Sequence, residues 1–541
     1  MKRAKISYDQ AKMLAPITRA YLNNDKSVQH LFRYESTVEN VAKVIADREK
    51  KYPANRKKLV SVLREQYANI SCSVRVASNI ESLKDSNAYT VTTGHQLNLF
   101  TGPLYFIYKI ISAISAAEEL NQKYTEHHFV PVYWMATEDA DFEEINHTFI
   151  NNQKLVWNSK QSGMVGEFST NDMDEVFQEL HSVLGSNISY DEIKKLVSEA
   201  YLGHNNLADA TRFLVNRLFE KDGLIIIDGN SPELKVLFSD IVKDELFNES
   251  SFKKVSKTID SYPLGYSAQV SPREVNLFYA IKGVRERIIR KGAGFEVYNT
   301  DIKFTMPSIL LEIENHPERF SPNVILRPVY QELILPNVMY IGGGAEIAYW
   351  LELKSTFEYH KVSFPLLQIR NSFLILDGNS VKKVLQCCLT LEEMFLPENE
   401  QIRKLLQGDN PFHEKLLAHK VEVDQKIKIL ISEIEEFDSS LITSLKSTKA
   451  GFLSELKKLD RKIMKSVKRK NEIKMNRLSA IRQVIYPRGS FQERRVNVIQ
   501  MVRQYGMNFF DIIKSNTDPF TTEMSILYPE DMTLKRDSDK E

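Results

Sequence analysis

Residues 88–135 read AYTVTTGHQLNLFTGPLYFIYKIISAISAAEELNQKYTEHHFVPVYWM, and the fold can be inferred outward from them. A short β-branched run, Ala88–Thr92, leads into a loop that contains glycine and proline. A helical pattern follows from Leu104 to Leu120, and the apolar run Phe129–Met135 comes next. A strand, a helix and a strand in this order predict a βαβ unit with parallel strands.

The same order recurs farther along the chain. Arg212–Phe219 has the spacing of an amphipathic helix, Leu224–Ile227 is typical of a buried strand, and Asp228–Glu233 opens another helix. We therefore predict an α/β fold with a doubly wound, Rossmann-like core. The predicted domains are an N-terminal helical part over 1–80, a catalytic core over 81–385 with insertions near 150–200 and 262–320, a helical coiled-coil arm over 386–485, and a segment over 486–541 that returns to the core.

The predicted arm lacks proline from Phe412 to Tyr486. Apolar residues recur there at alternating spacings of three and four, which is typical of a coiled-coil seam. Asp438–Ser440 is the predicted turn, with Gly451 as the alternative break. The second helix, of about 45 residues, should be the longer one and leave seam unpaired within one chain. We therefore expect a homodimer through this arm.

Composition narrows the class of protein. Of the 541 residues, 43% are hydrophobic and 26% charged, which is typical of a folded globular chain, and the formal net charge is +1. We therefore do not expect binding to nucleic acid. No signal peptide or membrane-length apolar run is evident, which predicts a soluble cytoplasmic protein. Cys387 and Cys388 are expected to be buried apolar residues in a helix.

The loop from Thr92 to Pro103 lies between a strand end and a helix start, where open α/β sheets bind ligands. Its glycines allow backbone to approach an anion, and its polar side chains can donate to phosphate or ribose oxygens. An equally good interpretation is a tight turn with satisfied polar groups. The candidate catalytic residues are Gly94, His95, Gln96, Asn98, Thr101 and Gly102.

Acidic residues follow the next strand. They could hold an ammonium group, bind a metal, or favour the start of a helix. A lone histidine, His147, is more typical of packing, so we predict no metal site. The candidate substrate-binding residues here are Trp134, Glu138, Asp139, Asp141 and Asn146.

Two later stretches supply further candidates. Arginines at 273 and 285 could clamp a carboxylate or phosphate, or could simply pair with neighbouring glutamates at the surface. Three glycines at 342–344 open a second strand-to-helix loop, although the spacing is not that of the dinucleotide fingerprint. The candidate substrate-binding residues are Arg273, Asn276, Arg285, Arg327, Gln331, Tyr340, Gly342, Gly343, Gly344, Glu346, Tyr349 and Trp350.

Several long motifs occur in the order found in one known family. They are TTGHQLNLFTGPLYFIYK, PVYWMATEDADFEEINH, GYSAQVSPREVNLFY and SPNVILRPVYQELILPNVMYIGGGAEIAYW, followed by PRGSFQERRVN near the end. From about residue 10 onward the chain resembles the bacillithiol biosynthesis cysteine-adding enzymes, the BshC family. Where this chain has His95, that family commonly has glutamine.

The resemblance implies a ligase that joins cysteine to the sugar amine of glucosaminyl-malate in the last step of bacillithiol synthesis. It implies a core similar to class I aminoacyl-tRNA synthetases, with ATP or ADP as ligand or co-substrate and a dimerising coiled coil. Thr92–His95 would stand where those synthetases carry their HxGH signature, and Arg370–Ser372 is a candidate for their second signature loop.

The resemblance also suggests a second nucleotide pocket where the chain leaves the arm. A capped helix end with surface charges explains the same residues equally well. The candidates are Arg488, Gln492, Arg494, Asn497 and Gly506. Two other functions remain open from the sequence: a synthetase-like ligase or nucleotidyltransferase acting on a different amine, and a non-catalytic coiled-coil binding protein.

Overall fold

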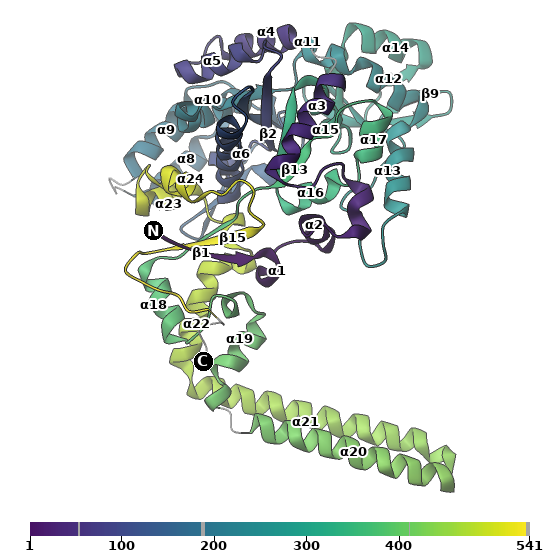
Figure 1. Ribbon diagram of the computed structural model, residues 1–541, viewed down its shortest axis with the longest axis vertical. Coiled ribbons are helices and arrows are strands. Elements are labelled where there is room, and N and C mark those ends of the chain that lie inside the picture. Colours follow the sequence, from purple (N-terminus) through teal and green to yellow (C-terminus); the bar gives the residue numbers. More distant parts are fainter. Residues whose placement is uncertain (52–54, 186–189, 410–411, 537–541) are drawn as a thin grey trace. The chain divides into compact units, whose positions relative to one another are not determined.

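The computed structural model describes residues 1–51, 55–185, 190–409 and 412–536. Contacts divide the chain into two units. The core unit comprises residues 3–374 and 490–526, and the arm unit comprises residues 1–2, 375–489 and 527–541. Figure 1 shows the helices and strands of both units. Residues 490–526 therefore belong to the core unit although they follow the arm in sequence.

A five-stranded parallel sheet, in the order β13-β12-β2-β3-β6, forms the centre of the core unit. Nearly every residue of these strands is buried, as expected for a parallel sheet with both faces covered. The predicted α/β, Rossmann-like fold is confirmed. The strands are β2 (Ala88–His95), β3 (His128–Met135), β6 (Ile225–Asp228), β12 (Asn337–Gly342) and β13 (Leu366–Ile369).

The strand order reverses its direction of winding beside β2, at a position called here the β2–β12 switch point. The chain runs from β2 to β3 and β6 on one side, and later adds β12 and β13 on the other side. The direction of winding thus changes between β2 and β12, and ligands bind at the carboxyl ends of strands at such a point. α6 (Leu104–Lys123) follows β2, and α16 (Gly344–Trp350) follows β12. The two loops singled out in the sequence, at 92–103 and 342–344, therefore meet at one edge of the sheet.

The N-terminal helices belong to the same unit as the sheet. Val60 and Leu63 pack in one hydrophobic cluster with sheet residues Val130 and Ile225. The apolar faces of the N-terminal helices are therefore buried against the core, and these helices do not form a separate body. These helices are α2 (Pro16–Leu22), α3 (Val41–Lys51), α4 (Arg56–Tyr67) and α5 (Val74–Ser82).

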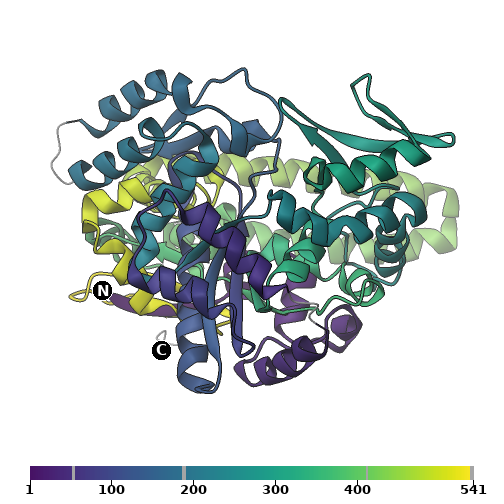
Figure 2. The same cartoon turned by 90° about the horizontal axis from the view of Figure 1, so that it is seen from above.

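Two stretches interrupt the sheet. The first holds the hairpin β4 (His147–Ile150) and β5 (Gln153–Val156), then α8 (Asp174–Leu184), α9 (Asp191–Leu202) and α10 (Leu207–Phe219). The second forms an antiparallel sheet in the order β10-β9-β8-β7-β11, a twisted ribbon at the upper right of Figure 2. Its strands are β7 (Leu277–Ile281), β8 (Val284–Lys291), β9 (Gly294–Val297), β10 (Lys303–Thr305) and β11 (Phe320–Pro322).

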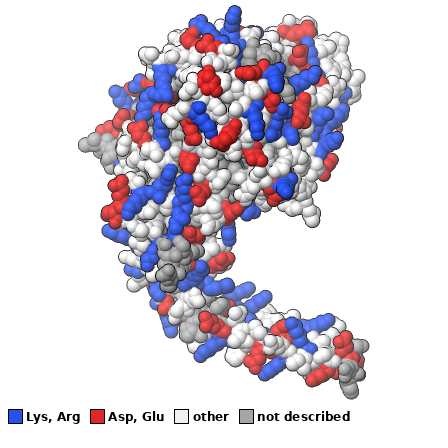
Figure 3. Space-filling model, viewed as in Figure 1, with Lys and Arg blue, Asp and Glu red and all other residues white. Residues whose placement is uncertain are grey.

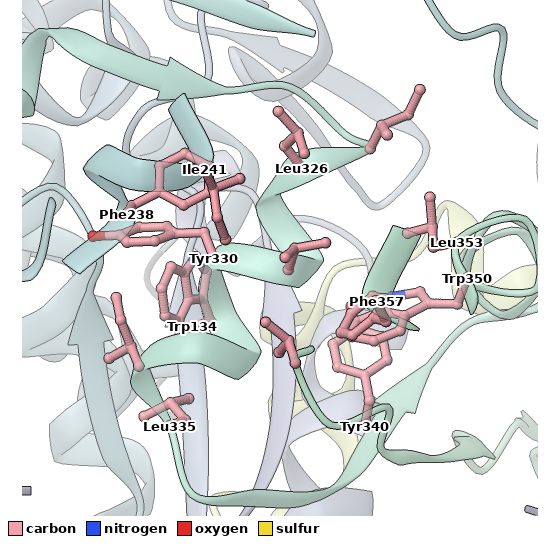
Figure 4. Packing of buried hydrophobic residues seen from close by; sticks show 14 of the residues in the cluster. Trp134, Phe238, Ile241, Leu326, Tyr330, Leu335, Tyr340, Trp350, Leu353 and Phe357 are labelled. Carbon is pink, nitrogen blue, oxygen red and sulfur yellow. The ribbon is translucent and has the colours of Figure 1, made fainter. Parts of the chain in front are cut away.

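Aromatic rings fill the core beneath the sheet edge. Trp134 meets Tyr330 edge-on with ring centroids 5.6 Å apart, and Trp350 stacks on Tyr340 at 4.3 Å (Figure 4). Both tryptophans are at most 2% exposed. Rings packed in this way bury large apolar areas. Trp134 and Trp350, which were predicted to bind substrate, therefore pack in the hydrophobic core of the unit.

In the arm unit, α20 (His413–Phe437) and α21 (Ile442–Lys470) lie side by side as an antiparallel pair (Figure 1). The turn predicted at Asp438–Ser440 is confirmed, because α21 begins just after it. The single second helix of about 45 residues was wrong: α21 has 29 residues, and α22 (Glu472–Ile485) begins after Asn471. The Asn471 side chain donates to Val467 O at 3.1 Å, and such local bonds compete with continuation of a helix.

The two adjacent cysteines differ from the expectation. α18 (Gly378–Gln386) ends just before them, and Cys388 has φ of 52° and is exposed, whereas Cys387 is buried. The prediction of two buried helical cysteines was therefore wrong for Cys388. The left-handed backbone at Cys388 ends the helix and turns its side chain outward.

Candidate functional site

The loop between β2 and α6 is a tight, well-supported turn. Phe100, Thr101 and Gly102 all have positive φ, between 51° and 70°. A Cβ atom on Gly102 would lie 2.5 Å from the Asn98 Cβ, so only glycine fits. From the C-terminal segment, Asn497 Nδ2 donates to the carbonyls of Phe100 and Gly102, each at 2.8 Å. The backbone shape of the loop is thus set by residues far apart in sequence.

Asn497 was predicted as part of a second nucleotide pocket. Its buried side chain instead supports the first loop, and it also reaches Thr148 Oγ1 at 3.0 Å. Gln492 is buried, Arg494 is exposed, and Gly506 ends α23 (Val498–Tyr505) with φ of 63°. Arg488 belongs to the arm unit. The structure therefore gives Asn497 a supporting role beside the β2 loop, and the second pocket stays a prediction.

His95 presents an unpartnered donor at the end of β2. Its Nδ1 accepts a hydrogen bond from Gln96 N at 2.9 Å, so the proton of the neutral ring lies on Nε2. Burial holds the pKa of His95 well below its usual value, and the nearby charges of Lys109 and Arg370 lower it further. Nε2 is enclosed and has no hydrogen-bond partner among the described residues. His95 is therefore a neutral ring whose Nε2–H can donate to an anion.

A buried ion pair lies beneath this loop. Lys109 of α6 is 2% exposed and pairs with Glu346 of α16 at 2.7 Å, and its Nζ also donates to the carbonyl of Gly94. Glu346 in turn accepts from Tyr340 Oη at 2.7 Å and from Gly343 N at 2.8 Å. The pair joins the ends of β2 and β12. Sequence reasoning missed Lys109, although a single lysine within an otherwise apolar helical stretch was a usable signal.

Arg327 brings a further cation to Gly94. Its guanidinium donates to Gln331 Oε1 at 2.9 Å and to Tyr349 Oη at 3.1 Å, and both of these partners are neutral. A Cβ atom on Gly94 would lie 3.5 Å from Arg327 Nη1. The structure thus brings together eight of the predicted residues at the β2–β12 switch point: Gly94, His95, Arg327, Gln331, Tyr340, Gly343, Glu346 and Tyr349. Gly342 ends β12, and Gly344 opens α16.

The acidic loop after β3 lines the neighbouring part of this edge. The Gln96 amide donates to Asp139 and to Glu144, each at 2.7 Å, so the first loop and the acidic loop are in contact. Asp141 caps α7 (Phe142–Ile145) by accepting from Glu144 N at 3.2 Å. Asn146 lies at the end of the same short helix. Asp139 is thus the predicted acid nearest to the loop of His95.

Glu138 pairs with a buried lysine, and a half-buried arginine lies in the same electrostatic environment. Lys235 donates to Glu138 and to Phe320 O, and its side chain is fully buried. Arg285 donates to Ser321 Oγ at 3.1 Å, and burial lowers its pKa while Glu138 and Asp139 oppose that shift. These groups form a polar cluster beside the acidic loop.

The remaining two predicted residues lie at the start of the antiparallel sheet. Asn276 is fully buried and donates to Glu245 Oε1 at 3.0 Å, which organises the turn before β7. Arg273 is exposed. The structure therefore gives Asn276 a local packing role, and the proposed clamp by Arg273 stays a prediction.

Within the described ranges, no helix is both long and apolar enough to cross a bilayer. No group of three or more histidine, cysteine, aspartate or glutamate residues with metal-binding geometry occurs among those residues either. Acidic and basic side chains are interspersed over the face seen in Figure 3.

The comparisons with known proteins agree along nearly the whole chain. Residues 1–371 match the family model described as "Bacillithiol biosynthesis BshC, N-terminal Rossmann-like domain", and residues 373–529 match "Bacillithiol biosynthesis BshC, C-terminal coiled-coil domain". Proteins named "Putative cysteine ligase BshC" are 38% identical in Christiangramia forsetii and 39% identical in Flavobacterium psychrophilum. Each alignment covers 96% of this chain and 98% of the relative.

A more distant relative of the same name, from Bacillus cereus, is 27% identical over 96% of this chain. A crystal structure described as a "putative arginyl t-RNA synthetase" from Campylobacter jejuni is 10% identical. It covers 82% of this chain and 98% of that chain, with a TM-score of 0.22. A score this low carries no argument about the fold. On the family models and the nearly full-length relatives, the chain belongs to the bacillithiol biosynthesis family BshC and is an enzyme of the ligase class.

Proposed function

We propose that this chain adds L-cysteine to the amine of glucosaminyl-malate, the last step of bacillithiol biosynthesis, with a nucleotide as co-substrate. The family assignment supports the reaction class. The observation that carries the proposal is the mixed character of the β2–β12 edge, where the unpartnered donor of His95 lies one residue from a glutamine held by two acids. Such a site suits a substrate that carries both an anionic and an ammonium group.

The residues at the β2–β12 switch point fit the phosphates of a nucleotide. His95 Nε2 is an enclosed donor without a partner among the described residues, and Arg327 adds a cation whose side-chain partners are neutral. Donors already in place stabilise negative charge more than donors that must reorganise. Joining a free carboxylate to an amine in water is unfavourable, and the nucleotide would supply the activation of the cysteine carboxyl.

The acidic loop fits the other end of cysteine. Asp139 and Glu144 lie on either side of the Gln96 amide and can hold an ammonium group. The sugar amine then attacks the activated carboxyl carbon. A C–N bond forms, the bond to the leaving group breaks with its electron pair, and the amine gives up a proton. Arg285, or Arg273 from the exposed turn before β7, would bind the malate carboxylates.

The oligomer and the compartment are part of the same proposal. The arm pair exposes large apolar side chains, among them Leu417 and Val421 of α20 and Phe452 and Leu459 of α21. Exposed apolar residues at helical spacing mark a surface that binds a partner. A second copy of this chain is the proposed partner, in the cytoplasm.

A coupling assay tests the function directly. Purified protein is incubated with cysteine, glucosaminyl-malate and ATP, and the thiol product is identified by mass spectrometry. The expected product requires all three components, and Asp139→Asn should raise the KM for cysteine. If folded protein forms no product with any nucleotide or divalent metal, the proposal fails. Product formed with a different amine instead would establish the other ligase interpretation.

A further inference from the structure

Arg370, just after β13, is held rigidly by a residue of the C-terminal segment. Its Nη2 meets Glu493 Oε1 at 2.5 Å and its Nη1 meets Glu493 Oε2 at 2.9 Å, a two-pronged pair in which Glu493 is fully buried. Nη1 also donates to Asn371 O and Ser372 Oγ, each at 2.9 Å. Both Nη atoms of the guanidinium are therefore engaged, and a bidentate pair fixes its plane.

The N–H on Nε of Arg370 differs from those on the Nη atoms. Arg370 is 6% exposed, and Nε has no hydrogen-bond partner in the described part of the chain. A Cβ atom on Gly343 would lie 3.8 Å from this nitrogen, so Nε faces the glycine loop that follows β12. A buried donor without a partner costs free energy, which a ligand oxygen would recover.

The second unpartnered donor is His95 Nε2, and the charge of Arg370 acts on the His95 ring. The ring of Tyr105, on the first turn of α6, is 5.2 Å from the His95 ring and 5.4 Å from the Arg370 guanidinium carbon. Tyr105 is half-buried and thus flanks both donors. Solvent reaches neither donor atom, and Tyr105 is the half-buried ring that borders both side chains.

The charges around the two donors favour an anion. Lys109, Arg327 and Arg370 are the cations, and Glu346 and Glu493 are the carboxylates, which leaves one positive charge in excess. Arg327 and Arg370 both lower the pKa of Lys109, so the three cations share one electrostatic environment. Glu144 and the exposed Arg494 also influence the pKa of Tyr105, and because their charges are opposite they leave this balance unchanged. An enclosed excess charge is stabilised when a counter-charge binds.

We propose that Arg370 Nε and His95 Nε2 donate to the oxygen atoms of one anionic group, and that Glu493 is the positioning residue that fixes the orientation of Nε. The C-terminal segment thereby completes the site. This inference rests on the proposed function only for the source of the oxygen, which is a nucleotide phosphate or the carboxylate of the amino acid.

Binding to the full-length protein, measured by calorimetry without turnover, tests the subsite. ATP is compared with adenosine, and cysteine with its methyl ester, so that each ligand has a partner that lacks its anionic group. His95→Phe keeps an aromatic ring and removes the donor, Arg370→Lys removes Nε, and Glu493→Gln removes the ion pair that orients it. Each variant should weaken the binding of one ligand about tenfold or more, which is the effect of losing a hydrogen bond to a charged group. Binding of the partner that lacks the anionic group should be unchanged.

Arg48→Lys is the matched control, because Arg48 and Glu332 form a buried pair elsewhere in the core unit. It should cost stability without changing anion binding, and an unfolding curve confirms that each variant is folded. A loss confined to ATP assigns the oxygen to phosphate, and a loss confined to cysteine assigns it to carboxylate. If His95→Phe and Glu493→Gln bind both anions as the wild type does, or the wild type binds neither, the inference is overturned. A chain that binds the anion but forms no amide refutes the proposed function alone.

Discussion

Lys109 and Glu346 form a 2.7 Å ion pair that joins the helix after β2 to the helix after β12. The two strands are neighbours in the sheet but about 240 residues apart in the chain, so the pair holds together the two loops of the site. Burial lowers the pKa of Lys109, and the carboxylate of Glu346 opposes that shift. The energy of the pair is therefore tied to the geometry of the site.

Lys109→Met should destabilise the protein by about 3 kcal/mol, because it leaves the Glu346 carboxylate, whose side chain is only 24% exposed, without its counter-charge. The free energy of unfolding in urea measures this. The double variant Lys109→Met/Glu346→Gln should recover part of the loss, since it removes the unpaired charge. Arg64→Met, which breaks the exposed pair with Glu81, should cost at most about 1 kcal/mol. Equal costs at the two sites would contradict a buried pair.

Asn497→Asp should reduce kcat more than Asn497→Ala does. The alanine variant only removes the donors that hold the carbonyls of Phe100 and Gly102. The aspartate variant turns an acceptor towards those two carbonyls, which repels them and opens the loop. Steady-state kinetics and an unfolding curve for each variant separate loop geometry from stability. If both variants keep wild-type kcat, the clamp has no part in catalysis.

The parts of the fold that follow from local pattern were predictable. The β-branched run before Gly94 and the apolar run ending at Met135 placed two neighbouring strands, and Asp438–Ser440 placed the turn of the arm. These signals depend on residues within a few positions of one another. The break at Asn471 was missed because one asparagine within a long helical pattern is a small signal beside the apolar seam around it.

The contacts that hold the site residues in place could not be predicted from local sequence patterns. Glu493 lies 123 residues beyond Arg370 in the chain, and no local period relates the two. Trp134 was among the predicted substrate residues, and its side chain lies on the face that packs on Tyr330. Which face of a strand end meets the ligand depends on tertiary packing, which the sequence pattern of a fully buried strand does not reveal.

Glu352 should make stability fall as the pH rises. Burial raises its pKa from 4.5 to about 7, although Gln269 N donates to it at 2.6 Å. Between these two values the unfolded chain has released the proton and the folded chain has kept it, so stability is lost across that window and then stays level. Glu352→Gln should flatten this decline in urea midpoints from pH 4 to 8. An unchanged slope in the variant would assign the decline to other groups.

The arm should form a dimer through the apolar stripe of α21. Phe452 and Leu459 are seven residues apart, lie on one face of the helix, and are each 46% exposed. Phe452→Lys/Leu459→Lys should shift the mass in sedimentation from that of two chains towards one, because charges in an apolar seam lose their solvation on pairing. Ser447→Lys/Ser454→Lys adds the same charges at exposed positions with the same spacing and should leave the dimer intact. A wild-type chain that sediments at 62.5 kDa at micromolar concentration would refute the dimer.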